Sequence, residues 1–167
     1  MLKIKTITEL KALQREPVDS ETYATSVKIV EHVRKGGRKA LLQEAERLGD
    51  ITSGQRIAYD RAALELAVRE LGDHERGVLE RTAQRIRKFA QGQRSCLQDF
   101  EIELSGGRAG HVFTPVDSAG CYAPGGRFSL PSTVLMTTVT ARVAGVERIM
   151  VASPKPTSVT LAAAGIA

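Results

Sequence analysis

The sequence predicts an α/β fold in which a helical N-terminal region precedes the first part of a parallel sheet. Helical patterns fill the first 95 residues, strand-like patterns follow them, and the last third runs strand, loop, helix, strand, helix. That order is typical of parallel strands joined by a crossover helix. We therefore expect residues 1–95 to be mainly helical, and residues 96–167 to form the first strand–helix–strand part of a sheet that is cut short at its C-terminus.

Composition narrows the class of protein. The chain has 167 residues, of which 42% are hydrophobic and 26% charged, which fits one soluble domain or part of a larger protein. The net charge of +5 comes from dispersed Lys and Arg, so we expect no nucleic-acid partner. We also expect no membrane partner, because no stretch approaches the roughly 20 apolar residues of a membrane span. Two cysteines and no apolar leader favour a cytoplasmic location.

Short helices are expected at the N-terminal end. Residues 6–14 form the first, and Ser20 is the candidate N-cap of the second, which Gly36–Gly37 should end. A third helix should cover residues 38–48. Residues 56–60 alternate in polarity and predict a short strand.

Two further helices should follow. Asp60 is a candidate N-cap for residues 61–71, and Asp73 begins a longer helix that ends near Gln93. The apolar stripe of this longer helix comprises Leu79, Ala83, Ile86 and Ala90, widened by Val78 and Phe89. The opposite face carries Arg81, Arg85 and Lys88, which we interpret as a solvated surface in preference to a phosphate-binding one.

Strand patterns begin after this long helix. Residues 100–104 alternate like a half-buried strand and precede a glycine turn, and residues 111–124 are strand-like but interrupted by Pro115. Residues 148–153 predict a buried strand, and a helix should begin after it.

The segment of residues 131–144 is ambiguous because its β-branched residues favour a strand. Pro131 suits a first helical turn, Ser129 could cap it, and Gly145 could end it, so we expect a buried helix.

Most motifs that carry chemistry are missing. The histidines His32, His74 and His111 lie far apart without metal-ligand spacing, and neither a nucleophile elbow nor a complete dinucleotide fingerprint is present. The remaining candidate is GCYAPGGRFSLPSTVLM, residues 120–136.

This glycine-containing segment could hold a ligand. Gly125 and Gly126 allow a ligand to approach the backbone closely, Arg127 adds positive charge, and Tyr122 offers a ring and a hydroxyl at the end of a predicted strand. The free N–H groups of the following helix would favour an anion. The alternative is a tight turn whose tyrosine packs on the core.

At these residues the sequence resembles the histidinol dehydrogenases. GCYAPGGRFSLPSTVLM and TARVAGVERIMVASPKP match the family's G-x-Y-x-P-G-G turn, P-S-[ST]-x-L-M helix and strand running into S-P-x-P. VDSAGCY, IRKFAQGQ and GGRKALLQEAERLGD resemble its earlier segments. Ala90 stands where the family has His, and Thr140 where many members have Pro.

The resemblance implies an incomplete Rossmann-like, NAD-binding domain. Members of the family oxidise L-histidinol to L-histidine in two NAD-reducing steps, use zinc to hold the substrate, and form homodimers. Their NAD-contacting tyrosine falls on Tyr122. Their zinc ligands and Glu-His acid–base pair lie further along the family's sequence than Ala167 reaches. We therefore expect no catalytic residue and no zinc ligand in this chain, and expect the chain alone to be inactive.

Other functions remain open at this stage. One is a stand-alone nucleotide- or anion-binding module without catalysis, and another is a basic nucleic-acid binder. A third is a related zinc-dependent dehydrogenase acting on another alcohol. If the chain is part of a longer enzyme, we expect exposed apolar surface along the sheet and the final helix.

Overall fold

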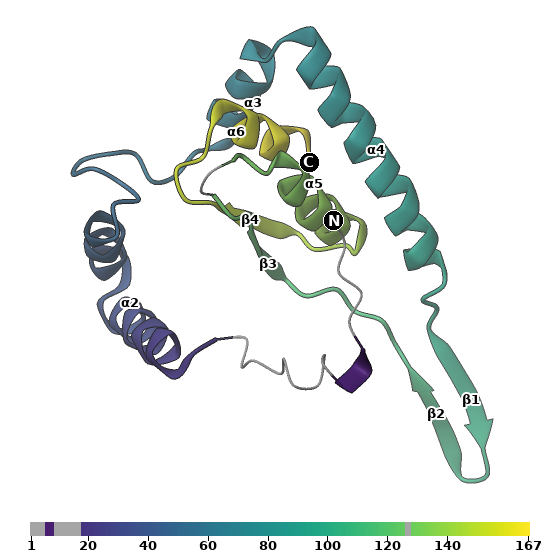
Figure 1. The fold of residues 1–167 in the computed structure, drawn as a ribbon. Helices are drawn as coiled ribbons and strands as arrows, with labels where there is room; N and C mark the ends of the chain where they lie inside the picture. The colour runs from purple at the N-terminus through teal and green to yellow at the C-terminus, as the bar shows by residue number, and fades with distance from the viewer. Residues whose placement is uncertain (1–5, 9–17, 126–127) are drawn as a thin grey trace. The chain divides into compact units, whose positions relative to one another are not determined.

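The computed structural model describes residues 6–8, 18–125 and 128–167 (Figure 1). The chain divides into two compact units, residues 1–54 and residues 55–167, which are described separately. The expected α/β class is confirmed, whereas the helix expected over residues 6–14 lies largely outside the described residues. The elements with assigned bounds are α2 (Ser20–Arg47), α3 (Arg61–Glu70), α4 (Asp73–Ser95), β1 (Phe100–Leu104), β2 (Gly107–His111), β3 (Ser118–Tyr122), α5 (Pro131–Val143), β4 (Arg148–Ala152) and α6 (Ser158–Ile166).

The first unit contains α2, whose N-cap is Asp19 and not Ser20 as predicted. The Asp19 backbone is extended, and its Oδ1 accepts a hydrogen bond from the Thr22 backbone N–H at 2.8 Å. Its Oδ2 also accepts from the Thr22 hydroxyl at 2.7 Å. The carboxylate therefore satisfies a free N–H group where the helix dipole favours negative charge.

A sharp kink divides α2, as the glycine pair predicted. Gly37 has φ 56° and ψ −141°, which are not helical, and it separates two helical arms. This positive φ is accessible to glycine at little cost. The two helices expected on either side of Gly36–Gly37 are therefore the arms of α2.

The second unit begins with an irregular segment, so the strand expected at residues 56–60 is wrong. Arg56 donates to the Ala58 carbonyl and its guanidinium lies 5.2 Å from the Tyr59 ring centroid. The alternating pattern is local, but a strand also needs a neighbouring strand to pair with. Asp60 caps α3 as predicted, accepting from the Ala63 N–H at 2.9 Å.

The long helix α4 follows its predicted pattern only in part. Its buried residues Leu79, Ala83 and Ala90 belong to the predicted stripe. Phe89 is 70% exposed and Val78 42% exposed, which corrects the expectation that both would widen the buried stripe. The helix contacts α5 and α6 along one narrow face, and these two side chains lie beyond it.

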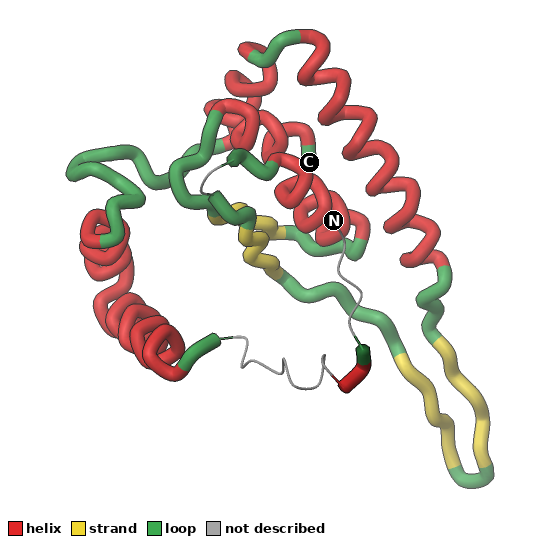
Figure 2. The backbone as a smooth tube through the Cα atoms, viewed as in Figure 1, coloured by secondary structure: helices red, strands yellow, loops and turns green. Residues whose placement is uncertain are grey.

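The strands β1 and β2 form an antiparallel hairpin, in which Phe100 pairs with His111 and Leu104 with Gly107 (Figure 2). The strand at residues 100–104 is confirmed, but its expected half-burial is wrong because all five of its residues are exposed. Alternation predicts which residues share a face. It does not guarantee that another element covers that face.

The strands β3 and β4 pair in parallel, with Ser118 opposite Arg148 and Tyr122 opposite Ala152. The helix α5 connects them, so the expected strand–helix–strand unit is present. Val134, Leu135 and Val139 of α5 are fully buried, as expected for this segment. The strand β4 was predicted to be buried, but it is buried only in part. Met150 is 66% exposed and lies on the face away from the core.

Four helices build the core of this unit: α3 packs on α6, and α5 contacts both α4 and α6 (Figure 1). Ala162 and Ala163 of α6 are fully buried, so the final helix is largely covered, contrary to expectation. The apolar surface expected along the sheet is present at Tyr122 and Met150. In the described part of the chain, no helix combines the length and apolar character needed to cross a membrane.

Candidate functional site

The candidate site lies where β3 and β4 end. Tyr122 and Ala152 are opposite each other at the last register position, and the Ala123 N–H donates to the Ala152 carbonyl at 2.9 Å. Ligands of open α/β sheets bind at this carboxyl edge. The Tyr122 side chain is 62% exposed, so it does not pack on the core as in the alternative of a plain turn.

Gly125 brings the loop after β3 against the loop after β4. A Cβ atom at Gly125 would lie 2.5 Å from the Pro154 carbonyl oxygen and 2.8 Å from its Cγ. Only glycine permits this approach without moving the backbone. Gly126 and Arg127, which the sequence also points to, lie outside the described residues.

Ser129 also joins the segment after β3 to the segment after β4. The prediction that it caps α5 is wrong. The N-cap position of α5 is occupied by Leu130, which provides no side-chain hydrogen bond. The Ser129 Oγ lies 3.1 Å from Thr157 Oγ1 and 3.0 Å from Thr160 Oγ1, at the start of α6. A local capping rule cannot anticipate this outcome, because the partners are 28 and 31 residues away.

Lys155 is a residue of this edge that the motif analysis missed. It follows Pro154 and has φ 45°, the one described non-glycine residue in the left-handed region. Such a conformation costs about 1–2 kcal/mol for an ordinary residue and is found where surrounding structure imposes it. Its position between Pro154 and Pro156 is the sequence signal, since two prolines restrict the backbone between them.

Two of the histidines make contacts within their own units. His32 contacts Glu44 in α2, and His111 lies 3.2 Å from the Gln98 carbonyl oxygen beside the hairpin. Over residues 6–8, 18–125 and 128–167, no group of three or more His, Cys, Asp or Glu is placed to hold a metal ion. The described residues therefore do not fit a zinc site.

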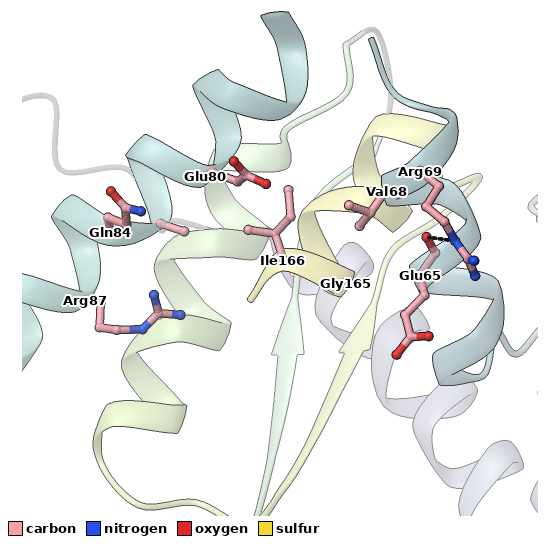
Figure 3. A pocket seen from close by; sticks show the side chains of 9 residues that line it. Glu65, Val68, Arg69, Glu80, Gln84, Arg87, Gly165 and Ile166 are labelled. Atoms are coloured by element: carbon pink, nitrogen blue, oxygen red, sulfur yellow. Dashed lines mark hydrogen bonds between the residues drawn. The ribbon is translucent and has the colours of Figure 1, made fainter. Parts of the chain in front are cut away.

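A separate open pocket of about 550 Å³ lies among α3, α4 and the end of α6 (Figure 3). Its charged groups have both signs, with Arg69 near Glu65 on α3 and with Arg87 and Glu80 on α4. Arg69 Nε donates to the Glu65 carbonyl at 3.4 Å, within the helix. None of its lining residues belongs to the carboxyl edge of the sheet, so this pocket is a different place from the loop site.

The side chains of Arg81, Arg85 and Lys88 are exposed, which fits both a solvated helix face and the phosphate-binding alternative. These three side chains lie on α4, away from the buried stripe of Leu79, Ala83 and Ala90.

Comparison with known proteins identifies the class and then the family. The fold is a mixed α/β one with a glycine-containing loop at the carboxyl edge of a parallel strand pair. The family profile described as histidinol dehydrogenase matches residues 13–167. The chain therefore belongs to the histidinol dehydrogenase family.

Individual relatives agree with this assignment. The chain is 36% identical over 141 residues to the histidinol dehydrogenase of Nitrosomonas europaea, covering 83% of this chain and 32% of that protein. It is 35% identical over 130 residues to that of Methanococcus maripaludis, covering 78% of this chain and 30% of the relative. The chain thus spans about a third of the length of these curated relatives.

Proposed function

We propose that this chain is the N-terminal portion of an NAD-dependent, zinc-requiring histidinol dehydrogenase that oxidises L-histidinol to L-histidine. The supporting observation is that the family match over residues 13–167 includes Tyr122, exposed at the carboxyl edge of parallel strands. Within the complete enzyme this chain would supply one edge of the NAD site. The strand–helix–strand unit would belong to an incomplete Rossmann-like domain.

The loop residues have properties that suit contact with a dinucleotide. Tyr122 presents an aromatic ring and a hydroxyl to solvent, and Gly125 keeps the following backbone close to Pro154. Lys155 directly follows Pro154, which Gly125 approaches, and its exposed side chain adds a positive charge that suits phosphate. The cofactor would supply the hydride acceptor for both oxidation steps, one NAD molecule for the alcohol and a second for the hydrated aldehyde. The residues of this chain would bind and orient it.

The zinc ligands and the residues that transfer protons are proposed to lie outside this chain. The resemblance places the zinc ligands and the Glu-His pair in a part of the family's sequence that this chain does not match. We propose that the chain alone is inactive, and that the complete enzyme is a cytoplasmic homodimer.

The test is titration of the isotope-labelled chain with NAD, followed by ¹H–¹⁵N NMR. We expect shift changes at Tyr122, Ala123 and Gly125, with a dissociation constant of roughly 1 mM or weaker, because most of the site is missing. Tyr122→Ala should abolish these changes. Tyr23→Ala is the matched control, since Tyr23 is similarly exposed (66%) but lies on α2.

Two outcomes would contradict the proposal. Absence of loop shifts at 10-fold excess over the expected dissociation constant would reject Tyr122 as an NAD contact. Micromolar affinity of the isolated chain would favour the stand-alone nucleotide-binding module.

A related dehydrogenase with another alcohol substrate is the second candidate. The chain is 36% identical over 127 residues to the histidinol dehydrogenase homolog 1 of Mesorhizobium japonicum, covering 75% of this chain and 25% of that protein. That identity equals the value for the Nitrosomonas enzyme, so identity alone does not separate the two. The enzyme expressed from the complete coding sequence would be assayed with L-histidinol and with other amino alcohols, and its preferred substrate would decide between the two candidates.

A further inference from the structure

We infer that Ser129, Thr157 and Thr160 form a hydroxyl tie that positions the glycine-containing loop at the carboxyl edge of the sheet. The three are positioning residues for the proposed NAD site, so the functional half of this inference rests on the proposed function. The hydroxyl tie is defined by three oxygen–oxygen distances: 3.1 Å from Ser129 to Thr157, 3.0 Å from Ser129 to Thr160 and 3.1 Å from Thr157 to Thr160.

The geometry allows every hydroxyl to be satisfied. A hydroxyl has one hydrogen to donate and two lone pairs to accept, so three hydroxyls in a triangle can each donate once around a ring. The second lone pair of Thr157 Oγ1 accepts the Thr160 backbone N–H at 3.3 Å. Bonds arranged in a ring polarise one another, and each is stronger than it would be alone.

The hydroxyl tie joins segments that are distant in sequence. Ser129 lies between the glycine-containing turn and α5, whereas Thr157 caps α6 and Thr160 lies in its first turn. Gly125 makes an independent contact with Pro154 on the other side of the turn. The described ends of the loop, Gly125 and Ser129, are therefore both held against residues 154–160.

The position of Ser129 argues for a role in the loop. A serine two residues before Pro131 could have capped α5, and a missing N-cap costs about 1 kcal/mol. Its hydroxyl instead bonds to α6, and α5 begins without a side-chain cap among the described residues. Thr160 is buried, with 6% of its surface exposed, while Ser129 is exposed. The buried threonine thus anchors an exposed loop residue.

The first test is amide hydrogen exchange of the chain without NAD, comparing the wild type with Ser129→Ala. We expect about five-fold faster exchange at the hydrogen-bonded N–H groups that flank the loop, those of Thr133 (to the Leu130 carbonyl) and Thr160 (to Thr157 Oγ1), because the hydrogen bonds of Ser129 are lost. Exchange at the buried α5 residues should not change. Ser129→Thr, which keeps the hydroxyl, should restore the wild-type rates.

Ser95→Ala is the matched control. This substitution also removes one serine hydroxyl. The Ser95 hydroxyl donates to the Gly92 backbone carbonyl at 2.8 Å and lies at the end of α4, away from the loop. Ser95→Ala should leave exchange in the loop unchanged. Unchanged loop exchange in Ser129→Ala, or a uniform increase through α5, would overturn the inference.

The second test is the NAD titration with the same variants. Ser129→Ala should weaken NAD binding by up to about five-fold, the limit set by a five-fold shift of the loop equilibrium toward opening, and Ser129→Thr should restore it. Faster loop exchange together with no NAD response in the wild type would reject the proposed cofactor but sustain the hydroxyl tie. Equal NAD affinity of Ser129→Ala and the wild type would reject the positioning role.

Discussion

His32 and Glu44 are joined by a hydrogen bond across the kink of α2, with His32 Nδ1 2.7 Å from Glu44 Oε1. His32 lies before Gly37 and Glu44 after it, so the pair joins the two helical arms. The other oxygen of Glu44 contacts Arg47 Nη2 at 2.7 Å. One carboxylate therefore holds a partner on each arm.

This pair predicts an acid-sensitive α2. The hydrogen bond from His32, followed by that from Arg47, lowers the pKa of Glu44 below its ordinary value of 4.5. Because the folded pKa is the lower one, the stabilisation is complete above pH 4.5 and is lost as pH falls through the folded pKa. Circular dichroism measured against pH should show an acid transition in the wild type and a smaller transition in Glu44→Gln.

Glu46→Gln is the control for that experiment, since Glu46 is an exposed carboxylate on the same helical arm. It should retain the acid transition of the wild type. Identical acid profiles for Glu44→Gln and Glu46→Gln would show that the contacts of Glu44 with His32 and Arg47 do not stabilise α2.

Thr138→Val should stabilise the second unit. Thr138 is 4% exposed, and within the described structure its Oγ1 has no hydrogen-bond partner. A buried polar group without a partner is destabilising, so replacing the hydroxyl by a methyl should raise the free energy of unfolding by about 1 kcal/mol. Urea denaturation would measure this change.

Thr137→Val is the matched control on the preceding residue. The Thr137 hydroxyl donates to the Thr133 carbonyl at 2.8 Å, so its removal should give no comparable gain. If Thr138→Val proves less stable than the wild type, the hydroxyl has a favourable role that burial does not reveal.

Gly165→Ala should destabilise the packing of α6 on α3. A Cβ atom at Gly165 would lie 2.9 Å from Val68 Cγ2 and 3.0 Å from the Leu64 carbonyl oxygen. The backbone oxygen cannot move without shifting α3, so we expect a loss of about 1–3 kcal/mol in the free energy of unfolding. Chemical denaturation followed by circular dichroism would detect it.

Gly92→Ala provides the opposite expectation in a helix of the same unit. A Cβ atom there meets nothing within 4 Å, so the higher helix propensity of alanine should stabilise the chain by about 0.5–1 kcal/mol. Equal effects of the two substitutions would mean that the close approach at Gly165 does not govern its cost.

The elements that depend on neighbouring residues were predictable from the sequence. Asp60 was identified as the cap of α3, the helical periodicity located α4, and the order of segments around α5 predicted a parallel strand pair. Each of these features follows from interactions within one helix or from the small number of chain connections that proteins use. The family motif singles out Tyr122 as an NAD contact, which stays a prediction.

Features that depend on distant segments were not predictable. The hydroxyl of Ser129 bonds to Thr157 and Thr160 at the start of α6, which lie 28 and 31 residues along the chain and which a local capping rule does not reveal. Phe89 and Met150 are exposed because no described element covers their faces, although their patterns suit burial. Local sequence thus specified the described helices, the strands β1, β3 and β4 but not β2, and the loop that follows Tyr122. The contacts that hold this loop against α6 arose only from packing, because they join residues about 30 positions apart.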